Sequence, residues 1–118
     1  MFHDNLSQMV RKVDGAMGAA IISTDGLVIE AVDRRGEPIE ADSAYSEYGL
    51  AIRQLMEIDD GVGLGEVKEF TLEGQDRSTL LRCLSSSYLA ALQVSAGSVM
   101  GKAVFELRVA SPDMAKEL

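Results

Sequence analysis

The sequence predicts an α+β domain in which a β-sheet is covered on both of its faces. Three segments have apolar residues at helical spacing and five have strand character, in the order helix, strand, strand, helix, strand, strand, strand, helix. Asp25-Gly26 separates two runs rich in isoleucine and valine, which is a strong short-range signal for a β-hairpin. Residues 19–22 are small or aliphatic at every position, as in a strand covered on two sides. Something must therefore cover each face of the sheet.

The first predicted helix spans residues 2–13. Asp4 or Asn5 can cap its start, and Gly15 can end it. Residues 19–23 and 27–32 follow as paired strands. The dipeptide between these strands predicts a type I′ turn, in which both central residues have positive φ.

A longer helix is predicted from a cap at Asp42 or Ser43 to about residue 58. At about 100° per residue, its apolar side chains cover roughly half of the circumference. Packing against one sheet needs a stripe only a little over about 100° wide. The apolar arc is therefore wider than packing against one sheet requires, which predicts a second partner for this helix. Gly49 would let another backbone come close. The apolar arc contains Ala44, Tyr45, Tyr48, Gly49, Ala51, Ile52, Leu55, Met56 and Ile58.

The glycine-rich run GVGLG at residues 61–65 is interpreted as a helix exit, because its spacing is not that of a nucleotide-binding loop. Three strands are then predicted at residues 67–73, 79–84 and 88–94. The first of these alternates and carries several charges, which is typical of an edge strand. A last helix begins near residue 99, and Pro112 either kinks it or starts a final turn capped by Ser111.

Composition narrows the class of protein. The 118 residues suffice for one domain, residues 1–118, and the formal net charge of -8 disfavours nucleic acid as a partner. The uncharged stretch 83–101 has the length of a membrane span, but its serines and glycines divide it into turns and a strand, so no membrane span is expected. The lone Cys83 cannot form an intramolecular disulfide, which fits a reducing, cytoplasmic location.

Catalytic and metal-binding patterns are not found in the sequence. His3 is the single histidine and lies near the chain start, so a nucleophile would have no well-placed base. One histidine and one cysteine about eighty positions apart do not make a metal site, and Asp59-Asp60 matches no calcium loop. We therefore expect no catalytic residues, no metal and no cofactor, and a protein that is not an enzyme.

Two residues on the polar side of the long helix are candidates for docking a partner. Leu50 is an isolated apolar residue there, and Arg53 could supply a docking charge. Tyr45 and Tyr48, three positions apart, could form a ligand platform or pack in a core or interface.

The order of elements and three local sequences resemble the Roadblock/LC7 family, close to its small prokaryotic MglB-like members. VDGAMGAAIISTDGLVIEA resembles the family's first helix exit and opening hairpin, and GLGEVKEFTLEG resembles its third strand. SSYLAALQVSAGSVMGKAVFELR is similar to its fifth strand and final helix. The resemblance covers nearly the whole chain.

The resemblance implies a profilin-like, five-stranded antiparallel sheet with the first and last helices on one face and the middle helix on the other. It also implies a homodimer, or a dimer with a Roadblock paralogue, formed through the middle helix and the third strand. The usual role of family members is to bind small Ras-like GTPases as scaffold, adaptor or activating protein, or to act as motor light chains. On this chain the implied dimer contacts are Tyr45, Tyr48, Gly49, Ile52, Met56, Val67, Glu69 and Thr71.

Other readings stay open at this stage. The chain could be a scaffold without a GTPase, or a small-molecule sensor that holds a ligand between helix and sheet. A sensor would need a polar-lined pocket, whereas the positions expected to be buried are aliphatic: Ile22, Leu27, Ile29, Leu81 and Leu92. An enzyme using Cys83 is the third reading.

The short C-terminal segment interrupted by Pro112 differs from that of longer family members.

Overall fold

A computed structural model of the chain describes residues 2–40, 43–58 and 63–118. Its elements are α1 (His3–Lys12), β1 (Ala16–Ser23), β2 (Val28–Asp33), α2 (Ser43–Met56), β3 (Glu69–Glu73), β4 (Arg77–Cys83), β5 (Tyr88–Ser95) and α3 (Met100–Lys116). The five strands form one sheet in the order β2-β1-β5-β4-β3, with every neighbouring pair antiparallel. The predicted order of elements and fold class are confirmed.

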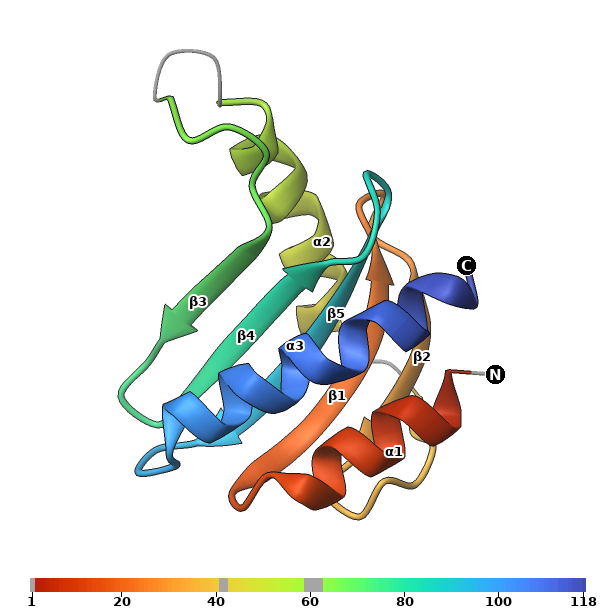
Figure 1. Cartoon of the computed structure of the whole chain (residues 1–118), viewed down its shortest axis with the longest axis vertical. Coiled ribbons are helices and arrows are strands. Elements are labelled where there is room, and N and C mark those ends of the chain that lie inside the picture. Colours follow the sequence, from red (N-terminus) through yellow and green to blue (C-terminus); the bar gives the residue numbers. More distant parts are fainter. Residues whose placement is uncertain (1, 41–42, 59–62) are drawn as a thin grey trace.

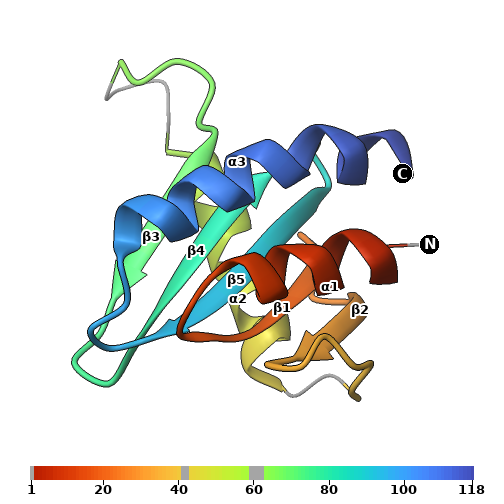
Figure 2. The ribbon, with the colours of Figure 1, turned by 60° about the horizontal axis from the view of Figure 1, so that its bottom comes forward.

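Helices cover both faces of the sheet. α1 and α3 lie side by side on one face, and α2 lies on the other (Figures 1 and 2). β1 explains this arrangement, because Ala19 and Ile21 point into the core beneath α1 and α3 while Ala20 and Ile22 point into the core beneath α2. All four side chains are fully buried. A strand apolar on both faces is stable only when both are covered.

The β1–β2 hairpin is present, but the predicted type I′ turn is wrong. A type I′ turn needs positive φ at both Asp25 and Gly26. Gly26 has a φ of 89°, but Asp25 does not have positive φ, because among the described residues only glycines have it. The Gly26 N–H donates to the Ser23 carbonyl, and the Ser23 hydroxyl accepts from the N–H groups of Asp25 and Leu27. Ser23 thus anchors a longer loop in which glycine alone takes the left-handed conformation.

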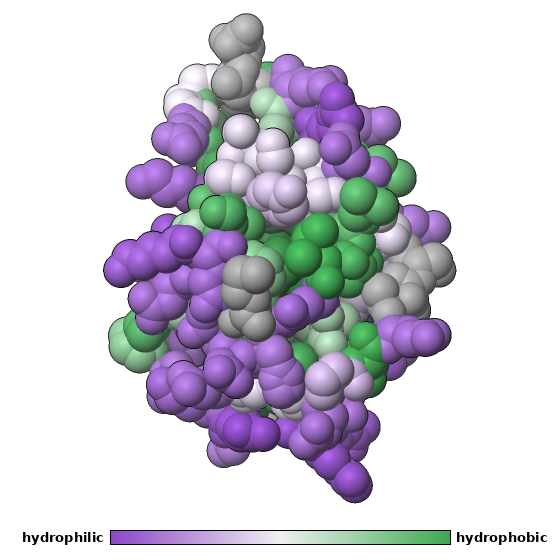
Figure 3. Space-filling view, turned by 90° about the vertical axis from the view of Figure 1, so that its right-hand side faces the viewer, coloured by the Kyte–Doolittle hydropathy of each residue, from purple (hydrophilic) through white to green (hydrophobic). Residues whose placement is uncertain are grey.

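The outer edge of β2 is less buried than expected. Leu27 is 64% exposed and Ile29 is 41% exposed, so the prediction that both are buried is wrong. Leu27 lies in the turn, and Ile29 lies on an edge strand. Ile39, whose N–H donates to the Ala31 carbonyl, adds a further exposed apolar side chain at this edge. Figure 3 faces this side of the molecule and shows apolar side chains gathered among polar ones.

The ends of the helices differ from the predicted caps. α1 begins at His3 without a side-chain cap, which places Asp4 in its first turn, where a negative charge favours the helix dipole. α3 continues through Pro112 to Lys116, and the Ser111 hydroxyl donates to the Leu107 carbonyl at 2.6 Å instead of capping a new turn. The Asp42 alternative for the α2 cap lies outside the described residues, as does part of the run 61–65.

The start of α1 and the end of α3 meet on one side of the molecule. The side-chain amide of Asn5 donates to a Glu117 carboxylate oxygen at 3.3 Å. In Figure 1 both chain ends lie on the right, and β3 forms the opposite edge of the sheet.

Candidate interaction surface

The inner face of α2 belongs to the core of its own chain. Tyr45 and Ile52 are 4% and 2% exposed and pack against the sheet. The hydroxyls of Tyr48 and Thr79 share a hydrogen bond of 3.0 Å, which ties α2 to β4. As placed in this chain, Tyr45 and Ile52 present almost no surface to a partner, contrary to their assignment as dimer contacts.

Gly49 also faces the sheet. A Cβ at this position would lie 2.3 Å from the Ser23 carbonyl oxygen and 2.9 Å from a methyl carbon of Ile22. The backbone that comes close to Gly49 is therefore β1 of the same chain, and the idea that Gly49 admits a partner helix is not what the structure shows.

One flank of α2 holds the β1–β2 hairpin. Leu50 lies over Gly26, where an added Cβ would be 3.2 Å from its side chain, and Arg53 forms a 2.9 Å ion pair with Asp25. Leu50 is 49% exposed, and both partners of the ion pair are largely exposed. The two predicted docking residues thus share one flank with the hairpin turn, and both remain accessible.

The opposite flank of α2 is apolar and partly exposed, since Tyr48 is half-buried whereas Ala51 and Leu55 are exposed. Tyr48, Ala51 and Leu55 lie along it at helical spacing, and the Tyr48–Thr79 hydrogen bond shows that this flank faces β4 and β3. On β3, Phe70 packs into the same core, so Leu72, two residues on, lies on the same face of the sheet. We call Tyr48, Ala51, Leu55, Phe70 and Leu72 the α2–β3 surface.

Two leucines of this surface lie on neighbouring elements and are about half exposed, Leu55 at 46% and Leu72 at 49%. Ala51 and Leu55 belong to the predicted apolar arc but were not among the predicted contacts. Leu72 and Phe70 were also missed, although the alternation along β3 could have indicated them.

The other face of β3 carries an ion cluster. The Arg108 guanidinium of α3 donates to both carboxylate oxygens of Glu69, at 3.0 and 2.7 Å, and Arg82 of β4 donates to one of them at 3.1 Å. These hydrogen bonds, Arg108 first, hold the pKa of Glu69 below its ordinary value. Glu69 in turn raises the pKa of Arg108. We call Glu69, Arg82 and Arg108 the Arg-Glu-Arg cluster.

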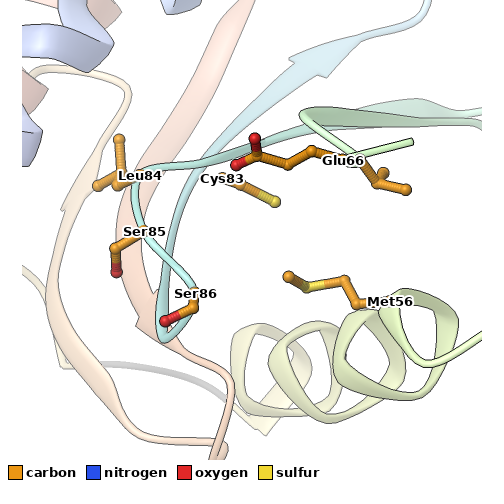
Figure 4. A pocket seen from close by; sticks show the side chains of 7 residues that line it. Met56, Glu66, Cys83, Leu84, Ser85 and Ser86 are labelled. Atoms are coloured by element: carbon orange, nitrogen blue, oxygen red, sulfur yellow. The ribbon is translucent and has the colours of Figure 1, made fainter. Parts of the chain in front are cut away.

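A cleft of about 260 Å³ lies between the end of α2, the segment that precedes β3, and the end of β4 with the turn that follows it. Cys83 and Met56 point toward one another across it (Figure 4). Burial raises the pKa of the Cys83 thiol, which keeps it protonated and weakly nucleophilic. Val67 also lines this cleft, so two predicted dimer contacts, Met56 and Val67, lie at one end of the α2–β3 surface.

The remaining polar groups do not assemble a reaction centre among the described residues. His3 Nε2 lies 3.4 Å from the Ser7 hydroxyl, but that hydroxyl donates to the Gly36 carbonyl at 2.6 Å. No cluster of three or more potential metal ligands occurs in the described part of the chain. Among the described helices, none has the length and hydropathy of a membrane span, and the uncharged stretch 83–101 runs from the end of β4 through β5 into α3.

Known proteins were compared with the chain by sequence and by structure. No protein-family profile and no curated protein sequence matches it. Among solved structures, MglC from Myxococcus xanthus is 28% identical, with a TM-score of 0.72 over 99% of this chain and 98% of that chain. The gliding protein MglB from Thermus thermophilus is 16% identical, with a TM-score of 0.82 over 96% of this chain and 84% of that one. A Roadblock/LC7 domain from Streptomyces avermitilis is 14% identical, with a TM-score of 0.76 over 98% and 95%.

Proposed function

This chain has the Roadblock/LC7 fold, in the form seen in MglB and MglC, and we propose that it is a non-catalytic, dimeric interaction module that binds and regulates a small Ras-like GTPase. Its partners are a second copy of the chain or a Roadblock paralogue, together with the GTPase. Its place of action is the cytoplasm.

The observation that supports dimerisation is the α2–β3 surface. Apolar side chains of a helix and of an edge strand lie on one face, where Ala51, Leu55 and Leu72 are exposed, and β3 has a neighbouring strand on one side only. Surfaces of this kind mark protein interfaces, because burying them removes apolar area from water without unfolding the chain. A second copy would supply both a matching helix flank and a matching strand.

The GTPase partner rests on the family resemblance. A regulator of this kind holds the switch loops of the GTPase in the reactive arrangement, while the nucleotide, Mg²⁺ and attacking water belong to the partner. Such a regulator therefore needs a surface that fits the switch loops and side chains that are accessible to them. Leu50 and Arg53 are accessible beside the hairpin turn. No side chain of this protein has to take part in bond breaking.

The small-molecule sensor is the competing function. The cleft beside Cys83 is of mixed polarity and has a volume of about 260 Å³, and a second cleft, lined in part by Asp25 and Arg53, has a volume of about 320 Å³. These volumes lie at or below the lower end of the roughly 300–1,000 Å³ typical of ligand pockets. Both clefts are small, and the exposed apolar side chains of the α2–β3 surface support an interaction module better than a ligand pocket.

Dimerisation is tested by the mass of the purified protein. Light scattering at micromolar concentration should give twice the 12.7 kDa of one chain. Leu55→Asp places a charge on the α2–β3 surface and should lower the mass, while Glu40→Lys, an exposed change at the far edge, should not. A wild-type mass of one chain would remove the homodimer and leave a paralogue as the partner.

GTPase binding is tested by affinity capture from the source cell, run in parallel with GDP and with a non-hydrolysable GTP analogue. Enrichment of one Ras-like protein with the GTP analogue, and loss of that enrichment with Arg53→Glu, is the expected result. The captured GTPase is then purified, and its hydrolysis rate is measured with and without this protein to separate activation from scaffolding. If neither capture contained a GTPase, the proposed GTPase partner would be wrong and only the assignment of the fold would remain.

A further inference from the structure

The solvent-facing side of α3 is apolar, although this helix already has an apolar inner side. Ala103, Leu107 and Met114 of the inner side are fully buried in the core. On the outer side, Phe105 is 57% exposed and Val109 is 52% exposed. A helix that packs on one sheet normally turns polar and charged residues toward the solvent. The outer residues of α3 therefore need a reason other than the packing of the single chain.

The outer apolar residues form one continuous stripe. At about 100° per residue, Gly101, Phe105, Val109 and Pro112 fall within a sector of about 80°, and all four are exposed. We call these four residues the α3 stripe. It is about 17 Å long at 1.5 Å per residue, which is three turns of helix. A Cβ at Gly101 would meet nothing within 4 Å, so the stripe is open at this end.

The α3 stripe is separate from the α2–β3 surface. α3 lies across the front of the sheet in Figure 1, and α2 lies behind the sheet. A partner on the α3 stripe would therefore leave the opposite face of the molecule accessible.

Basic side chains flank the α3 stripe on both sides. On the side toward β3, Arg108 is 57% exposed and binds Glu69, whose carboxylate it shares with Arg82. On the side toward α1, Lys102 is 52% exposed, and its Nζ lies 5.8 Å from the centre of the Phe105 ring. A segment that covered the stripe would thus meet positive charge along both of its edges.

The charge around the α3 stripe differs in sign from that of the whole chain, which carries a net charge of -8. Arg108 and Arg82 have the single carboxylate of Glu69 between them. An acidic partner is repelled by most of this protein and attracted here, and the difference orients the partner as it docks. The acids within α3 each lie 4.0 Å or less from a lysine of the same helix, in the pairs Lys102 with Glu106 and Lys116 with Asp113.

A cleft of about 220 Å³ adjoins the α3 stripe at Pro112. Arg82 and Arg108 line it together with the apolar side chains of Leu84 and Pro112. This combination fits the side chain of a glutamate, because its methylene groups can contact the apolar wall while its carboxylate accepts from a guanidinium N–H.

We propose that α3 docks an amphipathic helix of a partner protein, in which an apolar stripe is flanked on both sides by glutamate or aspartate. The apolar side chains of that helix pack along the α3 stripe, and Gly101 lets the two helices come close. Its acids pair with Arg108 and Lys102, and one of them enters the cleft beside Pro112. The proposal goes beyond the proposed function, because it adds a second partner on the face opposite α2.

Fluorescence anisotropy with two labelled synthetic peptides tests the proposal. Each peptide has about 18 residues, a length at which an isolated helix can form, with leucine at helical spacing along one side. Glutamate flanks the leucines in the first peptide, and lysine replaces every glutamate in the second. The glutamate peptide should bind the protein saturably, and the lysine peptide should bind at least about tenfold more weakly. Equal binding of the two peptides, or no binding of the glutamate peptide, would overturn the proposal.

Variants of the full chain locate the peptide. Phe105→Ser and Arg108→Glu should each weaken binding of the glutamate peptide at least about tenfold. Arg108→Gln removes the charge but keeps a hydrogen-bond donor for Glu69, so it gives the same test if Arg108→Glu does not fold. Arg53→Glu and Leu55→Asp, on the opposite face, are the matched controls and should leave the affinity unchanged. Circular dichroism melting checks that each variant is folded, and unchanged affinity in folded Phe105→Ser and Arg108→Gln would show that the peptide binds elsewhere.

Two other occupants of the α3 stripe are distinguished by the same variants. If Phe105→Ser lowered the mass of the protein in light scattering, a second copy of the chain would cover the stripe. If vesicles of phosphatidylcholine and phosphatidylserine bound the wild type but not Phe105→Ser, a lipid surface would cover it. Either result would overturn the proposal. The proposed function is tested separately, since Leu55→Asp reports on the dimer and Arg53→Glu on the GTPase.

Discussion

Replacing Gly49 by alanine gives the most direct test of how α2 sits on the sheet. A Cβ there would lie 2.3 Å from the Ser23 carbonyl oxygen, and ordinary van der Waals contact begins near 3.4 Å. The helix would have to retreat by about 1 Å, because backbone lies on both sides of the contact. Overpacking of this kind costs about 1–3 kcal/mol.

Two further effects act on the same substitution. Alanine stabilises a helix interior by about 1 kcal/mol relative to glycine. Retreat of α2 would stretch the 3.0 Å Tyr48–Thr79 hydrogen bond, whose loss costs about 1 kcal/mol. The free energy of unfolding should therefore fall by about 1–3 kcal/mol, which at about 4 °C per kcal/mol lowers the melting temperature by about 4–12 °C.

The assay is thermal melting followed by circular dichroism, with Gly101→Ala as the matched control. Gly101 also lies in a helix, but a Cβ there would meet nothing within 4 Å, so its replacement should raise stability by up to about 1 kcal/mol. If Gly49→Ala stabilised the protein as Gly101→Ala does, α2 would lie farther from β1 than described, and Gly49 would be free to meet a partner.

Three further predictions follow from the charged and sulfur-containing groups. Arg108 holds the pKa of Glu69 below 4.5, so the carboxylate stabilises the fold above pH 4.5 and this contribution is lost as the pH falls through the lowered pKa. Glu69→Gln should thus lower the free energy of unfolding by about 1–2 kcal/mol at pH 7, and urea titrations should show the difference narrowing below pH 4.5. Arg53→Ala should cost less than about 1 kcal/mol in the same titration, because the ion pair with Asp25 is exposed; a larger loss would mean that Arg53 orders the hairpin. Cys83 should react with iodoacetamide more slowly than free cysteine at neutral pH, as followed by mass spectrometry, and a fast reaction would revive a catalytic role for the thiol.

Local patterns in the sequence sufficed for the order of elements. The two apolar faces of β1 required coverings on both sides, and α1 with α3 on one face and α2 on the other supply them. The hairpin was also predictable, but its turn type was not. The Ser23 hydroxyl accepts two backbone N–H groups and favours a longer loop, which a two-residue turn signal cannot show.

The candidate surface was only partly predictable. A helical wheel places Gly49 on the apolar arc of α2, and glycine lets another backbone come close. The wheel cannot show whether that backbone belongs to the same chain or to a partner. The Arg-Glu-Arg cluster had no local signal, since Glu69 and Arg108 are 39 positions apart in the sequence. Contacts of this kind depend on the packing of α3 across β3 and β4, and only the folded structure reveals them.

The meeting of α1 and α3 near the two chain ends has a consequence for the connectivity of the fold. Because Asn5 and Glu117 touch, a short peptide could join the ends, and the chain could be reopened at an exposed turn such as the one between β4 and β5. Such a circular permutant would keep the same neighbours in space while changing their order along the chain. In the joined form the unfolded chain would have less conformational freedom, so a cyclised protein should melt at a higher temperature than the linear one.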